Sequence, residues 1–392
     1  MNGISFNREQ GQLGRKAAGE DHVSLLSFYN MELAASNPSL DCTSLPQAIT
    51  QGLSTTDSMF YYHVAEFFRT APGARLITAV YQNPSTDYSE IKAKVIESAG
   101  VVKQVGIWNG SQAVSYAKIE ALNAICEELA ALNMPVFSIE SPMVDEEDYA
   151  TLLDLSTVDC PFVSVVIAQD NAGFGVNSTE NVQTGIIGAA LGALARSQVH
   201  TSIAWVERQN MVTDFIKNPV TNQFHPSREL DNLGFLGGTN YSEFTPAQID
   251  ALDAKGYIFL RKHVSLAGSY FNHSRTATSV TSDYAFIENT RTMNKVQRAV
   301  YAQLLPKLSA PAYIDRNTGF LQADSVAGLE AIAEQGLAQM ERDGELSGYA
   351  VQIDPEQSIL STSKLQTKVR AVPVGVLREY EVSLGFTLKI NQ

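Results

Sequence analysis

Cysteines are few in this chain, and charged residues are sparse. The 392 residues include three cysteines, Cys42, Cys126 and Cys160, which form no CxxC pair and leave one thiol over in any disulfide scheme. Neither a disulfide framework nor a zinc knuckle is therefore supported, and we expect all three to be small core residues. Charged residues make up 18% and hydrophobic residues 44% of the chain. That balance excludes a disordered protein and is typical of globular domains.

The sequence also lacks any long apolar run. Its longest run of small apolar residues covers 185–195, whereas a membrane-spanning helix needs about 20 such residues. The chain is therefore predicted not to cross a membrane. Its start, MNGISFNREQGQLGRK, has no apolar core like that of a secretory signal, so we expect the protein to be made and folded in the cytoplasm.

Catalytic motifs are missing as well. No two of the six histidines have the i, i+4 spacing of a shared metal site, and neither a GxSxG elbow nor a Gly-Lys-Ser/Thr phosphate loop occurs. The glycine loop DNAGFGVNST has Gly173 and Gly175, but Ser178 stands where a dinucleotide loop has its third glycine. We interpret this loop as an ordinary strand-to-helix turn, and predict no catalytic residue, cofactor or metal.

Residues 44–200 alternate between apolar strand segments and helical segments. Strands are predicted at 76–81, 101–108, 135–139 and 162–168, and helices at 59–68, 88–98, 116–132, 146–155 and 178–197. The carboxylate run 145–148 would stabilise the start of helix 146–155. Small residues in helix 178–197 predict close packing within the chain. Alternation of this kind predicts a largely parallel sheet covered by helices, an α/β fold.

The rest of the chain has a different pattern. Residues 212–245 are rich in Asn and Gly and predict a long loop. After it, an α+β unit is expected, with a helix from 246, a strand at 256–260, a hairpin through 268–279, and helices at 290–308 and 325–342. The final segment alternates strictly between apolar and polar residues, which predicts a strand with one face to bury. Its apolar positions are Tyr380, Val382, Leu384, Phe386, Leu388 and Ile390.

Net charge is −14, which disfavours binding to nucleic acid or to anionic membranes. All of the excess lies before Arg291, because residues 291–392 hold 11 basic and 11 acidic residues. Arg291, Lys295 and Arg298 share one helix face in a stretch without acids, 289–314. Two interpretations are open: this basic stripe pairs with acids of the same fold, or it binds an acidic partner surface.

The C-terminal residues resemble a known family. The segments GYIFLRKHVSLAGSYFNHSRTATSVTSDYAFIENTRTMNKVQRAVYAQLLPKL, TGFLQADSVAGLEAIAEQGLAQMERDGELSGYAVQID and PVGVLREYEVSLGF are similar to contractile tail sheath proteins, especially those of Mu-like prophages. The N-terminal segment QGQLGRKAAGEDHVSLLSFY supports the resemblance.

This resemblance implies a multi-domain α/β protein with an α+β core domain and extended arms at both ends. Its parts would be an N-terminal arm and first strand that join the core domain (1–40), an α/β middle domain (41–211), a long loop (212–245), the sheath core domain (246–378) and a strand arm (379–392).

The resemblance also implies a non-enzymatic subunit that forms six-membered rings around an inner tail tube and contracts. Expected partners are the protein itself, the tube, and baseplate and terminator proteins, without nucleic acid or membrane insertion, in a particle assembled in the bacterial cytoplasm. The stripe Arg291, Lys295 and Arg298 is the candidate tube contact. Strand-arm candidates are Ile4, Phe6 and the six apolar positions of 380–390.

Two other functions stay open. One is a nucleotide- or sugar-binding α/β enzyme that uses the loop 170–178. The other is a surface adhesion module that binds a receptor through the loop 212–245.

Overall fold

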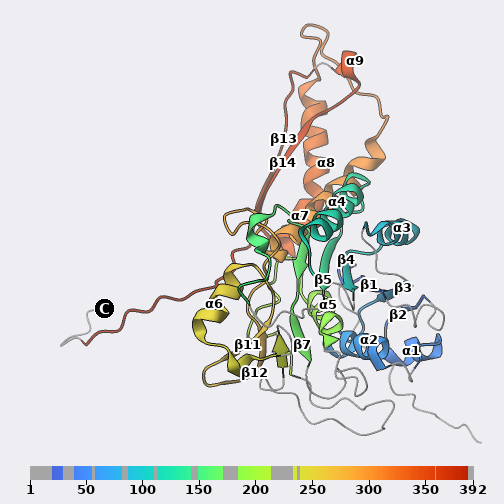
Figure 1. Ribbon diagram of the computed structural model, residues 1–392. Coiled ribbons are helices and arrows are strands. Elements are labelled where there is room, and N and C mark those ends of the chain that lie inside the picture. Colours follow the sequence, from blue (N-terminus) through green and yellow to red (C-terminus); the bar gives the residue numbers. More distant parts are fainter. Residues whose placement is uncertain are drawn as a thin grey trace, which may run out of the picture.

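The computed structural model describes residues 20–29, 39–54, 58–81, 87–109, 113–142, 149–170, 184–212, 233–235, 239–357 and 359–386. At its centre lies a six-stranded sheet of order β2-β3-β1-β4-β5-β6 (Figure 1), parallel except for β2 at one edge. The strands are β1 (Ser24–Tyr29), β2 (Asp41–Cys42), β3 (Leu76–Tyr81), β4 (Gln104–Trp108), β5 (Phe137–Ser141) and β6 (Val163–Val165). The predicted largely parallel α/β fold is confirmed.

Helices cover the sheet, and its central strands are accordingly apolar on both faces. Every residue of β1, β4 and β5 is buried, which is the pattern of a covered parallel sheet. Helix α5 (Ile187–Arg196) contacts β1, β4 and β5 and packs against α2 (Ser58–Thr70). Helices α3 (Ser89–Glu97) and α4 (Tyr116–Ala131) follow crossovers in the opposite direction and so cover the other face.

Small residues let α5 approach α2, as the sequence predicts. A Cβ on Gly192 would lie 2.9 Å from the carbonyl oxygen of Phe67, and one on Gly188 would overlap the His63 carbonyl. Both clashes are with backbone, which cannot turn away as a flexible side chain can. Glycine at these two positions therefore sets the distance between the helices.

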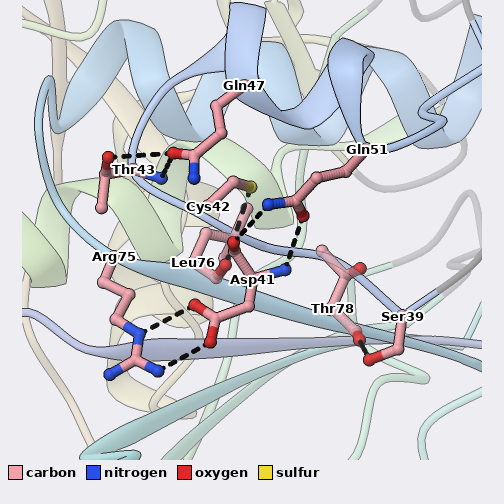
Figure 2. Close-up of polar contacts among 9 residues, drawn as sticks. All are labelled: Ser39, Asp41, Cys42, Thr43, Gln47, Gln51, Arg75, Leu76 and Thr78. Carbon is pink, nitrogen blue, oxygen red and sulfur yellow. Dashed lines mark hydrogen bonds and ion pairs between the residues drawn. The ribbon is translucent and has the colours of Figure 1, made fainter.

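The β2 edge of the six-stranded sheet is closed by side chains (Figure 2). The Gln51 carboxamide accepts from the Asp41 amide at 3.0 Å and donates to the Asp41 carbonyl at 2.7 Å. Arg75 forms a two-pronged ion pair with the Asp41 carboxylate, at 2.8 and 2.7 Å. Gln51 follows the short helix α1 (Leu45–Thr50). Because Gln51 occupies the outward-facing groups of Asp41, β2 does not offer them to another strand.

The predicted helix 146–155 is wrong over the residues that the structure describes. Residues 143–148, including the carboxylate run, lie outside the described residues, and 149–154 form no helix before the 3₁₀ turn η1 (Leu155–Thr157). Lys255 Nζ donates to the carbonyls of Tyr149, Ala150 and Leu152 at 2.6–3.0 Å. These carbonyls are held by a distant lysine, so tertiary contacts outweigh the local helical pattern.

A smaller antiparallel sheet lies beside the first. The predicted strand 162–168 divides into β6 and β7, and parts of the predicted loop 212–245 add strands and a 3₁₀ turn. The sheet has the order β10-β9-β7-β8, and the elements are β7 (Ala168–Asp170), β8 (Thr184–Gly185), β9 (Leu233–Phe235), β10 (Thr239–Asn240) and η3 (Tyr241–Glu243). The interpretation of 212–245 as one irregular loop is therefore incomplete.

The C-terminal part begins with α6 (Pro246–Ala254) and a hairpin of β11 (Leu260–His263) and β12 (Leu266–Phe271). This hairpin turns at 264–265, earlier than predicted, with Ser265 at φ 64°. A long helix pair follows with a second hairpin, which the sequence did not predict. The elements are α7 (Ile287–Leu304), η4 (Leu305–Lys307), α8 (Ala323–Arg342), β13 (Leu346–Ile353), α9 (Ile359–Thr362) and β14 (Thr367–Pro373).

Helices α7 and α8 with β13 have their own small core, which includes Val296, Leu337 and Val351. In Figure 1, α8 and the β13–β14 hairpin rise away from the six-stranded sheet. The predicted boundary at residue 40 implies that the first strand joins this C-terminal unit, but it does not. Instead β1 lies between β3 and β4 at the sheet centre, because its unbroken apolar run suits a strand covered on both faces. No helix in the described ranges is long and apolar enough to cross a bilayer.

Substituting Gly188 tests the close packing of α5 on α2. Gly188→Ala should lower the free energy of unfolding by about 1–3 kcal/mol, since the added methyl forces the helices apart. Gly328→Ala on α8 is the matched control, because a Cβ there meets nothing within 4 Å. It should raise stability by about 0.5–1 kcal/mol. Urea unfolding of both variants measures the effect, and equal stabilities would contradict this packing.

Candidate assembly site

The C-terminal arm (379–392) is described as far as residue 386, and that part leaves the body of the protein without a partner strand among the described residues. Residues 374–386 have no regular secondary structure, and in Figure 1 the chain extends away from all labelled elements. Four arm side chains, Tyr380, Val382, Leu384 and Phe386, are exposed, with Val382 at 71% and Leu384 at 93%. The alternation is thus present, but the predicted strand has no partner among the described residues. Leu388, Ile390, Ile4 and Phe6 lie outside them.

The arm departs from a fixed point. Arg378 forms an ion pair with Glu288 of α7, and its guanidinium carbon lies 3.5 Å from the centroid of the Phe286 ring. Burial raises the pKa of the Glu288 carboxyl, and the charge of Arg378 opposes that rise. This charge pair and cation–π contact hold the chain against the start of α7. The residues after Arg378 are therefore the part of the arm that is able to contact another molecule.

The β13–β14 hairpin has two open edges in the described part of the chain. The two strands pair antiparallel from Leu346 with Pro373 to Ile353 with Thr367, and no third strand joins them. β14 carries side chains that alternate between half-buried and exposed along its first six residues. Unpaired edges of this kind can accept another strand. The hairpin differs in this respect from β2, whose outward groups are occupied by Gln51.

The residues of the basic stripe lie close together in the structure, and two of them form ion pairs with acidic residues of the same chain. Lys295 Nζ lies 2.7 Å from Asp21 and 2.6 Å from Glu345, and Arg298 lies 2.7 Å from Asp21. Arg291 is 4% exposed, and its Nη2 donates to the Ser197 carbonyl at 3.2 Å. Of the two interpretations, these contacts show the intramolecular one. They do not test the predicted tube contact.

The acidic partners of the basic stripe, Asp21 and Glu345, were not predicted from the sequence. Asp21 lies just before β1 and Glu345 just before β13, so each is far from α7 in sequence. Burial alone would raise the pKa of the Asp21 carboxyl, but Lys295 and Arg298 outweigh it and the pKa is lowered. The acid-free stretch 289–314 is a signal that the neutralising carboxylates come from elsewhere. It does not say from where.

The proposed ligand loop of an enzyme gains no support. Residues 171–178 lie outside the described ranges, and Asp170 ends β7. At the carboxyl edge of the sheet, Glu140 Oε1 accepts from the Tyr88 hydroxyl at 3.1 Å, and its pKa is raised by burial. With 1% exposure, Glu140 does not reach the surface. Among the described side chains, no group of three or more His, Cys, Asp or Glu is placed to hold a metal.

Comparison with known families decides the relationship. Residues 1–275 match the N-terminal domain, and residues 283–391 the C-terminal domain, of DUF2586. The chain belongs to the DUF2586 family. No curated protein sequence matches this DUF2586 protein.

Solved structures share the fold of this DUF2586 protein over nearly its whole length. A sheath complex of an extracellular contractile injection system, PVC, in its contracted state has a TM-score of 0.61 at 13% identity, covering 100% of this chain and 98% of that one. A chain of the anti-feeding prophage baseplate has a TM-score of 0.59 at 12% sequence identity, and the match covers 100% of this chain and 99% of that one. The sheath tail protein of Desulfitobacterium hafniense has a TM-score of 0.52 at 10% sequence identity, and the match covers 95% of this chain and 100% of that one. The fold is thus that of contractile sheath proteins.

Asp21 is the residue on which the α7 cluster depends, and Asp21→Asn should destabilise the protein. We expect a loss of about 2 kcal/mol at pH 7, since Lys295 and Arg298 lose a half-buried partner. The native pKa of Asp21 is below the unfolded value, so its stabilisation is complete above that unfolded pKa and is lost as pH falls through the native one. The difference between variant and wild type should therefore shrink below about pH 4.

Urea unfolding at pH 7, 5 and 3.5 measures this difference. Asp41→Asn is the matched control, because Asp41 pairs with Arg75 at an exposed position and should cost about 0–1 kcal/mol. Equal losses for the two variants at pH 7 would contradict a central role for Asp21.

Proposed function

We propose that this DUF2586 protein is the sheath subunit of a contractile tail or injection particle, and that it assembles by strand exchange between subunits. The observation that carries the proposal is the C-terminal arm, an alternating segment whose apolar side chains at 380–386 are exposed and have no cover among the described residues. The shared fold with sheath proteins supports the same conclusion.

The arm needs a surface that supplies both backbone partners and apolar contacts. Burying each of Tyr380, Val382, Leu384 and Phe386 is worth about 1.5–3 kcal/mol, before the cost of ordering the arm. A sheet edge on another subunit meets both needs, because strand addition pairs every second backbone group while alternate side chains pack. The open β13–β14 hairpin is the acceptor that we propose. The segment with Ile4 and Phe6 would add a strand in the same way.

Stacked six-membered rings around an inner tube are the assembly that these joints would hold together. Arms that stay paired let subunits slide without separating, while the interfaces between bodies change from one packed arrangement to another. Such two-state interfaces can store the energy of contraction. One similar structure is a six-fold symmetrised baseplate and another a contracted sheath, which fits this scheme. Tube, baseplate and terminator proteins would be its partners in a bacterial particle.

The tube contact of Arg291, Lys295 and Arg298 stays a prediction. Arg291 is buried and the other two cations already bind Asp21 or Glu345. Reversing all three charges would therefore break the subunit's own ion pairs. A loss of tube binding in that variant would not separate a tube contact from misfolding.

Removing the arm's apolar face tests strand exchange. Replacing Tyr380, Val382 and Leu384 with Asn should leave a folded subunit and abolish polymers, since the body makes no described contact with these side chains. The matched control, Glu379→Gln, Glu381→Gln and Ser383→Asn, changes the opposite face and should polymerise like wild type. Negative-stain electron microscopy and sedimentation measure polymer length. Full-length tubes from the apolar-face variant would overturn the proposal.

A further inference from the structure

A small cavity lies where the amino edge of the six-stranded sheet meets α7. The space open to the centre of a water-sized sphere is about 10 Å³, and the cavity is lined by Asp21, Lys103, Val199, Arg291, Asn294 and Arg298. Lys103 directly precedes β4, while Arg291, Asn294 and Arg298 lie on one face of α7. The space suits one water molecule or one monatomic ion and is too small for a phosphate or sulfate group.

The charges that line the cavity do not balance. Three cations face one carboxylate, and that carboxylate is already engaged, with Asp21 Oδ1 bound by Arg298 and Oδ2 by Lys295. Among the described residues, no carboxylate lies within ion-pair distance of Arg291 or Lys103. Two cations at this junction therefore form no ion pair, although the charges of Glu20 and Asp21 act on Lys103 and that of Asp21 on Arg291.

Hydrogen-bond donors are also left over. Arg291 Nη1 is buried and has no hydrogen-bond partner, while Nη2 of the same group binds the Ser197 carbonyl. Lys103 Nζ has three donors, and the structure gives it one acceptor, the Gly100 carbonyl at 2.7 Å. Asn294 donates its Nδ2 to the Val136 carbonyl at 3.3 Å. The lining thus lacks an acceptor rather than a donor.

We infer that this cavity binds a single halide ion, chloride under ordinary conditions, held by Lys103, Arg291 and Arg298. A halide accepts several N–H donors at once and supplies the missing negative charge, whereas a water molecule supplies no charge. The ion would tie the segment before β1, the amino edge of the sheet and α7 to one another. This site is independent of the proposed sheath function, since it lies within one subunit.

The acid–base properties of the lining agree with this assignment. Burial, followed by the charge of Arg298, lowers the pKa of Lys103 to about 8. Burial likewise lowers the pKa of Arg291 to about 10. Both cations are thus destabilised by their surroundings when no further anion is present, and a bound halide would relieve that cost.

Chloride-35 NMR of the full-length protein tests the site directly. Wild type should broaden the chloride signal in excess of surface binding, and bromide should compete. Lys103→Met, which keeps the aliphatic stem, should weaken chloride affinity at least about tenfold, since it removes a charged donor. The matched control is Lys92→Met, which removes an exposed lysine paired with Glu128 and should bind chloride as wild type does.

A second measurement does not depend on any variant. At constant ionic strength, replacing gluconate with chloride should raise the wild-type melting temperature by about 1–3 °C. Equal broadening by wild type and a folded Lys103→Met protein would overturn the inference. So would a melting temperature that does not respond to chloride, which would indicate that the cavity holds water.

Discussion

The uncovered apolar face of residues 380–386 is the constraint on which the proposed assembly depends. A single strand cannot satisfy its own backbone groups, and water disfavours its exposed aromatic and aliphatic side chains. Arg378 fixes the start of the arm at Glu288 and Phe286. The arm therefore starts from a defined point, and in the proposed assembly another subunit supplies the edge that it pairs with.

The edge strand β2 is blocked by a side chain, whereas in the described part of the chain the strands β13 and β14 each have an unpaired edge. At β2, Gln51 pairs with both backbone groups of Asp41, so this edge of the large sheet is closed. At β13 and β14, the described residues leave the edges open. This contrast favours the C-terminal hairpin over β2 as the acceptor in the proposed strand exchange. A closed edge on the large sheet protects the subunit from nonspecific association before assembly.

Helix α7 joins the parts of the subunit. Its cations bind Asp21 before β1 and Glu345 before β13, and its first turn binds the base of the arm through Glu288. Any displacement of the arm or of the N-terminal segment therefore acts on the same helix. Half-buried ion pairs of this kind are directional and costly to break singly, so they hold both segments rigidly against α7.

Much of the fold follows from local pattern, and much of the site does not. The strand at 76–81 and the helix from Tyr116 were predictable because each carries its own periodicity, and Ser115 caps that helix through the Lys118 amide. The turn at Ser265 has no glycine to mark it. The β13–β14 hairpin was missed, although β-branched and charged residues alternate over 367–370 of β14. The partners of the basic stripe depend on tertiary contacts that no local pattern encodes.

Cryo-electron microscopy of the assembled protein tests strand exchange most directly. The account predicts that residues 379–386 of each subunit form a strand hydrogen-bonded to the β13–β14 hairpin of a different subunit, with Val382 and Leu384 buried there. An assembly in which every arm folds back onto its own subunit, with both hairpin edges still open, would contradict it.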